Sequence, residues 1–120
     1  MAEGVKNELY NWDEDEWVML NMVKLQLTGD VIFVKGHINY DTVMLVYQQG
    51  LTLMSSMKHI EVDLQGVEKS DSSSLALLIE WIRNSKARQQ SITFLNIPKF
   101  VQDLAKACGV NLIISGVTHG

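Results

Sequence analysis

Hydrophobic and polar residues alternate along the stretch VKLQLTGDVIFVKGHI, residues 23–38. Alternation at every second position is typical of a strand with one buried face, and here it occurs on both sides of Gly29-Asp30. A glycine-aspartate pair between two such segments favours a tight hairpin turn. We therefore predict two antiparallel strands, with Gly36 at a bend or bulge in the second.

The period of the pattern changes after residue 40. Between residues 41 and 57 apolar side chains recur at helical spacing, which predicts a helix with Asp41 as its N-cap and Gly50 inside it. An interior glycine costs a helix about 1 kcal/mol relative to alanine. The further elements predicted are a strand at 60–64, a helix at 72–89, a strand at 91–97 before Pro98, a helix at 99–108 and a last short strand at 110–115.

This order, β-β-α-β-α-β-α-β, predicts an α/β fold in a single domain. The later βαβ units require parallel pairing with right-handed crossovers, and the opening hairpin adds one antiparallel strand. The sheet should therefore be mixed and mostly parallel, with helices packed on it. We assign residues 21–120 to this domain and residues 1–20 to an acidic N-terminal extension, which carries six acidic residues against one lysine.

Charge and cysteine content exclude several classes of function. The formal net charge is −4, and a chain without a basic field is a poor candidate for binding nucleic acid. Cys108 is the only cysteine, so an intramolecular disulfide and a cysteine-based zinc site are excluded. No apolar run approaches the roughly 20 residues that span a bilayer, and the acidic start does not resemble a signal peptide. We expect a soluble cytoplasmic protein without a metal or a cofactor.

The sequence lacks the motifs of common enzymes. It contains no glycine-rich nucleotide loop and no G-x-S-x-G elbow, and its histidines, at 37, 59 and 119, are scattered. A serine nucleophile needs a base within hydrogen-bond reach, whereas His59 is predicted at the opposite end of the sheet from the serines of 72–74. Cys108 is predicted on the inner stripe of the last helix as a small core residue. We therefore expect a protein that works by binding.

The stretch KSDSSSLALL, residues 69–78, is the main candidate site. Asp71 or Ser72 can cap the following helix, which stabilises it by roughly 1 kcal/mol and needs only one residue. Helical geometry places one stripe toward the core, namely Leu75, Leu78, Ile79 and Ile82. It places a second stripe on the opposite side, namely Ser73, Leu77, Trp81, Asn84 and Arg88. Exposed apolar residues beside polar ones indicate a partner surface, although Trp81 could instead pack under the N-terminal extension or a neighbouring helix.

The first turn of this helix is also a favourable place for a phosphate. The helix dipole and the free N–H groups stabilise an anion there. Phosphorylation of Ser73 would add about −1.5 to −2 units of charge beside Asp71 and would repel an acidic partner.

Three segments resemble known patterns of STAS domains. HIEVDLQGVEKSDSSSLALLIEWI is similar to their strand, D-L-x-x-V turn and D-S/T-x-G/S-L helix start. FVKGHINYD resembles their G-E-L-D segment, with His37 in place of the usual acid, and SITFLNIPKFVQDLAKACGVNLII resembles the strand, the helix and the last strand that follow in the family. The resemblance covers about residues 21–115 and implies a STAS-type fold. Ser74 stands where the family usually has glycine.

The resemblance implies two alternative roles. In the MlaB branch, a hydroxyl residue at the position of Ser72 contacts the ATPase subunit of an ABC transporter for phospholipids, so the membrane is reached only through that complex. In the anti-sigma-factor antagonist branch, the position of Ser73 accepts phosphate from an anti-sigma kinase. The runs LALL and LAKACGVN are more similar to MlaB, which we favour. The partner-binding residues expected are Asp71, Ser72, Ser73, Ser74, Leu77, Trp81, Asn84 and Arg88, with Ser73 and Ser72 as phosphate acceptors.

Overall fold

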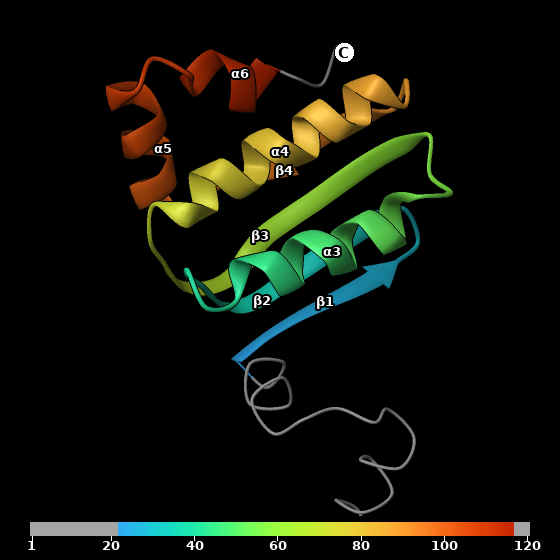
Figure 1. Cartoon of the computed structure of the whole chain (residues 1–120), viewed down its shortest axis with the longest axis horizontal. Coiled ribbons are helices and arrows are strands. Elements are labelled where there is room, and N and C mark those ends of the chain that lie inside the picture. Colours follow the sequence, from blue (N-terminus) through green and yellow to red (C-terminus); the bar gives the residue numbers. More distant parts are fainter. Residues whose placement is uncertain (1–21, 117–120) are drawn as a thin grey trace, which may run out of the picture.

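A computed structural model describes residues 22–116, so the acidic extension, with Trp12 and Trp17, and His119 lie outside the described part. The strands are β1 (Val23–Thr28), β2 (Val31–Ile38), β3 (His59–Ser70) and β4 (Ser91–Leu95). The helices are α3 (Val43–Met54), α4 (Ser73–Ala87), α5 (Lys99–Ala107) and α6 (Asn111–Gly116). Figure 1 shows α3 and α4 side by side over the sheet, with α5 and α6 beyond α4.

The four strands form one mixed sheet in the order β1-β2-β3-β4. β1 and β2 pair antiparallel as a hairpin, whereas β3 pairs parallel with both β2 and β4. The register shifts between Gly36 and His37, and Gly36 has a φ of 110°. These observations confirm the predicted α/β class, the hairpin, the parallel crossovers and the irregularity at Gly36.

The core lies between one face of the sheet and the helices. Ile32 and Val34 of β2 are buried, and so is Val62 of β3. Phe33, which lies between Ile32 and Val34 in the strand, is exposed on the other face of the sheet. Alternation in the sequence therefore marks the two faces of the sheet correctly. The carboxyl ends of β2 and β3 lie at the same edge, because these strands are parallel, and they lead directly into α3 and α4. That edge positions the candidate site.

The predicted last strand at 110–115 is wrong, because these residues form helix α6. The amides of Ile113 and Ile114 both donate to the carbonyl of Val110. Ile114 is buried and Val110 half-buried one turn before it, whereas Leu112 and Ile113 are exposed. A short apolar run cannot distinguish a strand from a helix by periodicity, and packing of one helical face decided the outcome here.

The inner stripe of α5 also differs from the prediction. Val101 and Ala105 are its buried residues, and Leu104 is half-buried. Cys108, which was expected on the inner stripe, is exposed, and so is Phe100. Small side chains at 101 and 105 allow the helix to pack closely. Cys108 is therefore not a core residue, and it stands at the C-terminal cap of the helix.

The turn between β2 and α3 uses a different cap from the predicted Asp41. Thr42 is the N-cap residue, and its buried hydroxyl donates to the carbonyl of His37 at 2.9 Å and accepts from the amide of Asn39 at 3.0 Å. The side-chain oxygen of Asn39 accepts from the amides of Asp41 and Thr42, at 2.9 and 3.1 Å. This hydrogen-bonded turn fixes the position of Tyr40 beside the start of α4.

The expectation that Leu77 and Trp81 lie on the outward side of α4 is wrong, and the alternative that Trp81 packs under a neighbouring helix is confirmed. Leu77 is 2% exposed and Trp81 is fully buried. The indole nitrogen of Trp81 donates to the carbonyl of Tyr47 on α3 at 3.3 Å, and the ring lies against Gly50. Because α3 lies beside α4, the helix has a second buried side in addition to the stripe toward the sheet. Its exposed residues are Ala76, Glu80, Arg83, Lys86 and Ala87.

Candidate functional site

Asp71 joins the start of α4 to the turn after β2. Its carboxylate accepts from the backbone amide of Ser73 at 2.9 Å and from the hydroxyl of Ser73. Its other oxygen accepts from the amide of Tyr40 at 3.3 Å. The hydroxyl groups of Tyr40 and Ser72 lie 3.1 Å apart. Asp71 is thus the residue whose side chain caps this end of α4, as one of the two predicted alternatives stated, whereas Ser72 makes no side-chain cap.

The surroundings of Asp71 favour its ionised form. Partial burial raises the pKa of this carboxyl, but the hydrogen bonds from the side chain and backbone of Ser73 and from the backbone of Tyr40 act in the opposite direction and together hold it below its usual value. The carboxylate therefore remains a fixed negative charge at the start of α4 at neutral pH.

Replacing Asp71 by alanine is expected to lower the free energy of unfolding by about 1 kcal/mol at neutral pH, because a capping side chain is lost. A carboxyl with a lowered folded-state pKa stabilises the fold above its unfolded-state pKa of about 3.9 and loses this effect as the pH falls through the folded value. The difference between the two proteins in urea denaturation should therefore shrink below about pH 4.

Asp41→Ala is the matched control for this measurement, because Asp41 is exposed and has no capping role. Its stability should follow that of the unmodified protein at every pH. A deficit in Asp71→Ala that persists unchanged in acid would contradict the assignment of a charged cap.

The three consecutive serines have different surroundings. Ser72 is exposed, and Ser73 is 6% exposed with its hydroxyl turned to Asp71. Ser74 is buried, and its hydroxyl has no hydrogen-bond partner among the described residues. It borders a small cavity whose other lining residues are apolar, among them Ile38, Leu78 and Val101. Ser72 is therefore the hydroxyl most available to a partner, while Ser74 belongs to the core.

Ser74→Ala is expected to leave the stability unchanged or to raise it by up to about 1 kcal/mol, because an unsatisfied buried hydroxyl is unfavourable and alanine is the better helix former. Thermal and urea unfolding of the full chain measure the change, with Ser72→Ala at the exposed neighbour as the reference. A clear loss of stability in Ser74→Ala would mean that its hydroxyl is hydrogen-bonded.

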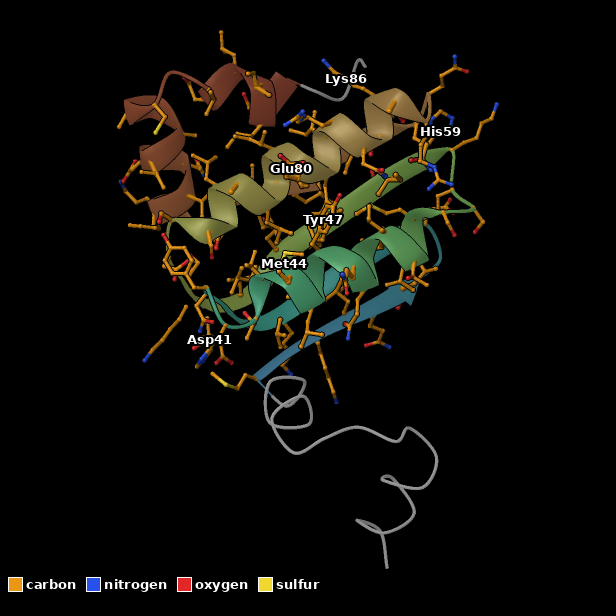
Figure 2. All side chains as sticks on the ribbon, viewed as in Figure 1. Asp41, Met44, Tyr47, His59, Glu80 and Lys86 are labelled. Atoms are coloured by element: carbon orange, nitrogen blue, oxygen red, sulfur yellow. The ribbon has the colours of Figure 1, made fainter. Side chains whose placement is uncertain are left out.

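A surface groove of about 480 Å³ lies between α3 and α4, next to the serines. Figure 2 shows Met44 and Tyr47 on the side of α3 that faces α4, with Glu80 on α4 above them. We call this feature the α3–α4 groove. Its lining residues are Tyr40, Val43, Met44, Tyr47, Ser72, Ser73, Ala76, Leu77 and Glu80.

The groove results from the sizes of the side chains along the two helices. At the start of α4, the residues that border α3 are small, namely Ser72, Ser73 and Ala76. Further along, Trp81 fills the space completely and contacts Gly50. The helices are therefore in close contact at one end and separated by an open apolar space at the other, beside the carboxyl edge of the sheet.

The predicted site residues do not all lie together. Asp71 lies at the start of α4, and Ser72, Ser73 and Leu77 line the groove. Asn84 is half-buried further along α4, and Arg88 is exposed at its C-terminal cap. The residues that the sequence did not indicate are Tyr40, Val43, Met44, Tyr47, Ala76 and Glu80. The one available signal was the position of Tyr40 two residues after a strand that ends at this edge.

The residues that line the groove include no histidine. His59 lies at the start of β3, and its Nδ1 is 2.8 Å from the hydroxyl of Ser91 at the start of β4. Figure 2 shows His59 at the end of the molecule opposite to Asp41, as the sequence predicted. Within residues 22–116, no three His, Cys, Asp or Glu side chains form a possible metal site. No helix in the same range is long and apolar enough to cross a membrane.

Comparison with known proteins identifies relatives over most of the chain. The family model described as "Mlab, STAS domain" matches residues 21–115. No curated protein sequence matches the chain. Among solved structures, a chain of the Acinetobacter MlaFEDB complex in an ATP-bound conformation is 26% identical, with a TM-score of 0.61 over 71% of this chain and 90% of that chain.

Anti-sigma factor antagonists share the same fold. Unphosphorylated SpoIIAA is 17% identical, with a TM-score of 0.59 over 74% of this chain and 82% of that chain. The phosphorylated form of the Bacillus cell fate determinant SpoIIAA is 15% identical, with a TM-score of 0.56 over 73% of this chain and 84% of that chain. At these identities the likeness concerns the fold alone.

Proposed function

Because this chain belongs to the STAS domain family, we propose that it is a non-catalytic MlaB-like subunit that binds the ATPase of an ABC transporter for phospholipids. In this role it stays in the cytoplasm and reaches the membrane only through the transporter. Its binding surface is the start of α4 with Ser72 and the adjoining α3–α4 groove. Asp71 and the turn before α3 hold this surface in place through the contacts with Tyr40 and Ser73.

The observation that carries the proposal is the relationship to the chain from the MlaFEDB complex. That chain is 26% identical and is covered over 90% of its length, and the matching family model carries the MlaB description. The groove supports a binding role, because a hydroxyl and an apolar space lie together at the surface, whereas His59 lies away from the serines, against Ser91.

Affinity purification of the full chain from its native cells tests the proposal. We expect an ABC transporter ATPase to co-purify in near-equal amounts and to remain bound through size-exclusion chromatography. An unrelated cytoplasmic protein with the same tag is the control. Recovery of an anti-sigma kinase without any ATPase would refute the transporter role.

The second candidate is an anti-sigma-factor antagonist that is switched by phosphorylation. It is supported by the exposed Ser72 at the N-cap of α4 and by the related fold of SpoIIAA, which has a phosphorylated form. Phosphate on Ser73, the acceptor implied by the resemblance, would displace its hydrogen bond to Asp71. Mass spectrometry of the native protein tests this role: phosphate on Ser72 or Ser73 supports it. An unmodified chain whose Ser73→Asp variant binds its partner normally removes it.

A further inference from the structure

We propose that the α3–α4 groove receives a basic amphipathic helix of the protein partner, which inserts apolar side chains into the groove and places lysine or arginine next to its acidic border. This inference rests on the proposed binding role, but not on which protein is the partner. It names the chemistry of the segment that binds.

The lining of the groove suits apolar side chains. Val43, Tyr47 and Leu77 form its inner part and belong to the core or pack against it. Tyr40 and Met44 stand beside it and are 73% and 59% exposed. Tyrosine and methionine are enriched at protein interfaces, and the flexible methionine side chain adapts to different partners. These side chains gain buried apolar contacts when a partner covers the groove.

The shape of the groove suits a helix. The residues that α4 contributes within the helix are Ser73, Ala76, Leu77 and Glu80, which follow the spacing i, i+3, i+4, i+7 along one line. At a rise of 1.5 Å per residue this line is about 10 Å long, or about two helical turns. A hydrophobic groove is one of the forms of surface that bind amphipathic helices, through residues at the same spacing.

The charges around the groove select a basic segment. Glu80 lines the groove, Asp71 precedes Ser72, and Asp41 follows Tyr40. None of the lining residues in the described part of the chain is lysine or arginine, and the sequence of α3 has no charged residue. Arg83 pairs with Glu80 at 3.1 Å, but both side chains are exposed, so the pair holds Glu80 only weakly. A partner cation at this border meets complementary charge.

The same charges disfavour two other occupants. Residues 1–20 of this chain have a net charge of −5, so the N-terminal extension would bring further acid to an acidic border. A second copy of the chain would place two identical acidic borders together in a symmetric contact. A basic segment of a different protein is therefore the occupant that fits.

A photoreactive benzophenone amino acid at position 44 of the full chain, illuminated in native cells, tests the inference. We expect a cross-link to one protein, mapped by mass spectrometry to a helical segment with lysine or arginine within one turn of apolar residues. The same amino acid at Phe33, which is exposed on the opposite face of the sheet, is the control and should not label that segment. A cross-link to an acidic segment, to residues 1–20, to a second copy or to nothing would overturn the inference.

Two pairs of variants separate the groove from other contacts. Ala76→Trp fills the groove and should reduce the cross-link at least tenfold, while Ala87→Trp, on the same exposed face of α4 but outside the groove, should not. Glu80→Lys should reduce the yield of the cross-link several-fold, most strongly at low salt. Glu61→Lys, at an exposed position of a strand, should leave this yield unchanged. Circular dichroism confirms folding of each variant. If Ala76→Trp does not fold, the comparison of Glu80→Lys with Glu61→Lys decides whether the partner binds at the groove.

The outcomes for the two proposals are distinguishable. A mapped basic helix on a protein other than an ABC ATPase, blocked by Ala76→Trp, would refute the transporter role and leave the groove assignment intact. If the ATPase co-purifies but the cross-link is unchanged in Ala76→Trp and Glu80→Lys, the transporter role stands and the groove assignment is refuted.

Discussion

Trp81→Ala is expected to lower the free energy of unfolding by about 3–5 kcal/mol, which is a large part of the stability of a domain of this size. The side chain is fully buried between α3 and the rest of the core, so its removal leaves a large cavity. The variant also loses the hydrogen bond from the indole nitrogen to the carbonyl of Tyr47. Urea denaturation followed by circular dichroism of the full chain measures the loss.

Arg83→Ala is the matched control, because Arg83 lies half a turn further along α4 and is exposed. Its stability should change by less than about 0.5 kcal/mol. If Trp81→Ala kept its stability and lost only partner binding, the tryptophan would be a surface anchor after all, and the packing of α4 against α3 described above would be incorrect.

Gly50→Ala is expected to destabilise the protein by about 1–3 kcal/mol, although the same change in an exposed helix interior is stabilising. A β-carbon at position 50 would stand 2.4 Å from Cζ2 of Trp81 and 2.8 Å from its ring nitrogen. The indole is rigid and enclosed, so either the ring or the helix must move. Gln48→Ala, at an exposed position of α3, should be neutral or slightly stabilising and controls for helix propensity.

A double-mutant cycle identifies the physical cause. Phenylalanine at position 81 lacks the indole nitrogen and the fused second ring that approach Gly50. The penalty of Gly50→Ala should therefore be smaller in a Trp81→Phe background, with a coupling of about 0.5–3 kcal/mol. Equal penalties in both backgrounds would mean that the glycine is needed for a reason other than contact with the indole.

The Gly50–Trp81 contact also bears on the binding site. It holds α3 close to α4 at one end, while the small side chains of Ser72, Ser73 and Ala76 leave the space between the helices unfilled at the other. The groove thus results from the change along α4 from small side chains at its start to the large Trp81 further on. The cap formed by Asp71 then fixes Tyr40 at the open end through its backbone amide.

The sequence by itself determined the elements with strong local patterns. Alternation identified the buried faces of β2 and β3, because a strand has a period of two and one side of this sheet is covered. The hairpin, the parallel crossovers and the family followed from the order of the elements and from the serine motif. Where the pattern was short or ambiguous, as at residues 110–115, the local sequence did not decide between helix and strand.

Only the tertiary structure decided which sides of α4 are buried. Helical periodicity located one stripe, but it carries no information on how many neighbours a helix has. The approach of α3 buried Leu77 and Trp81 as well, and Gly50, which looked like a defect in α3, is the position that permits this approach. The groove was equally hidden, because Tyr40 and Met44 come from one segment and Glu80 from another, and the two segments meet only when both helices pack on the same face of the sheet.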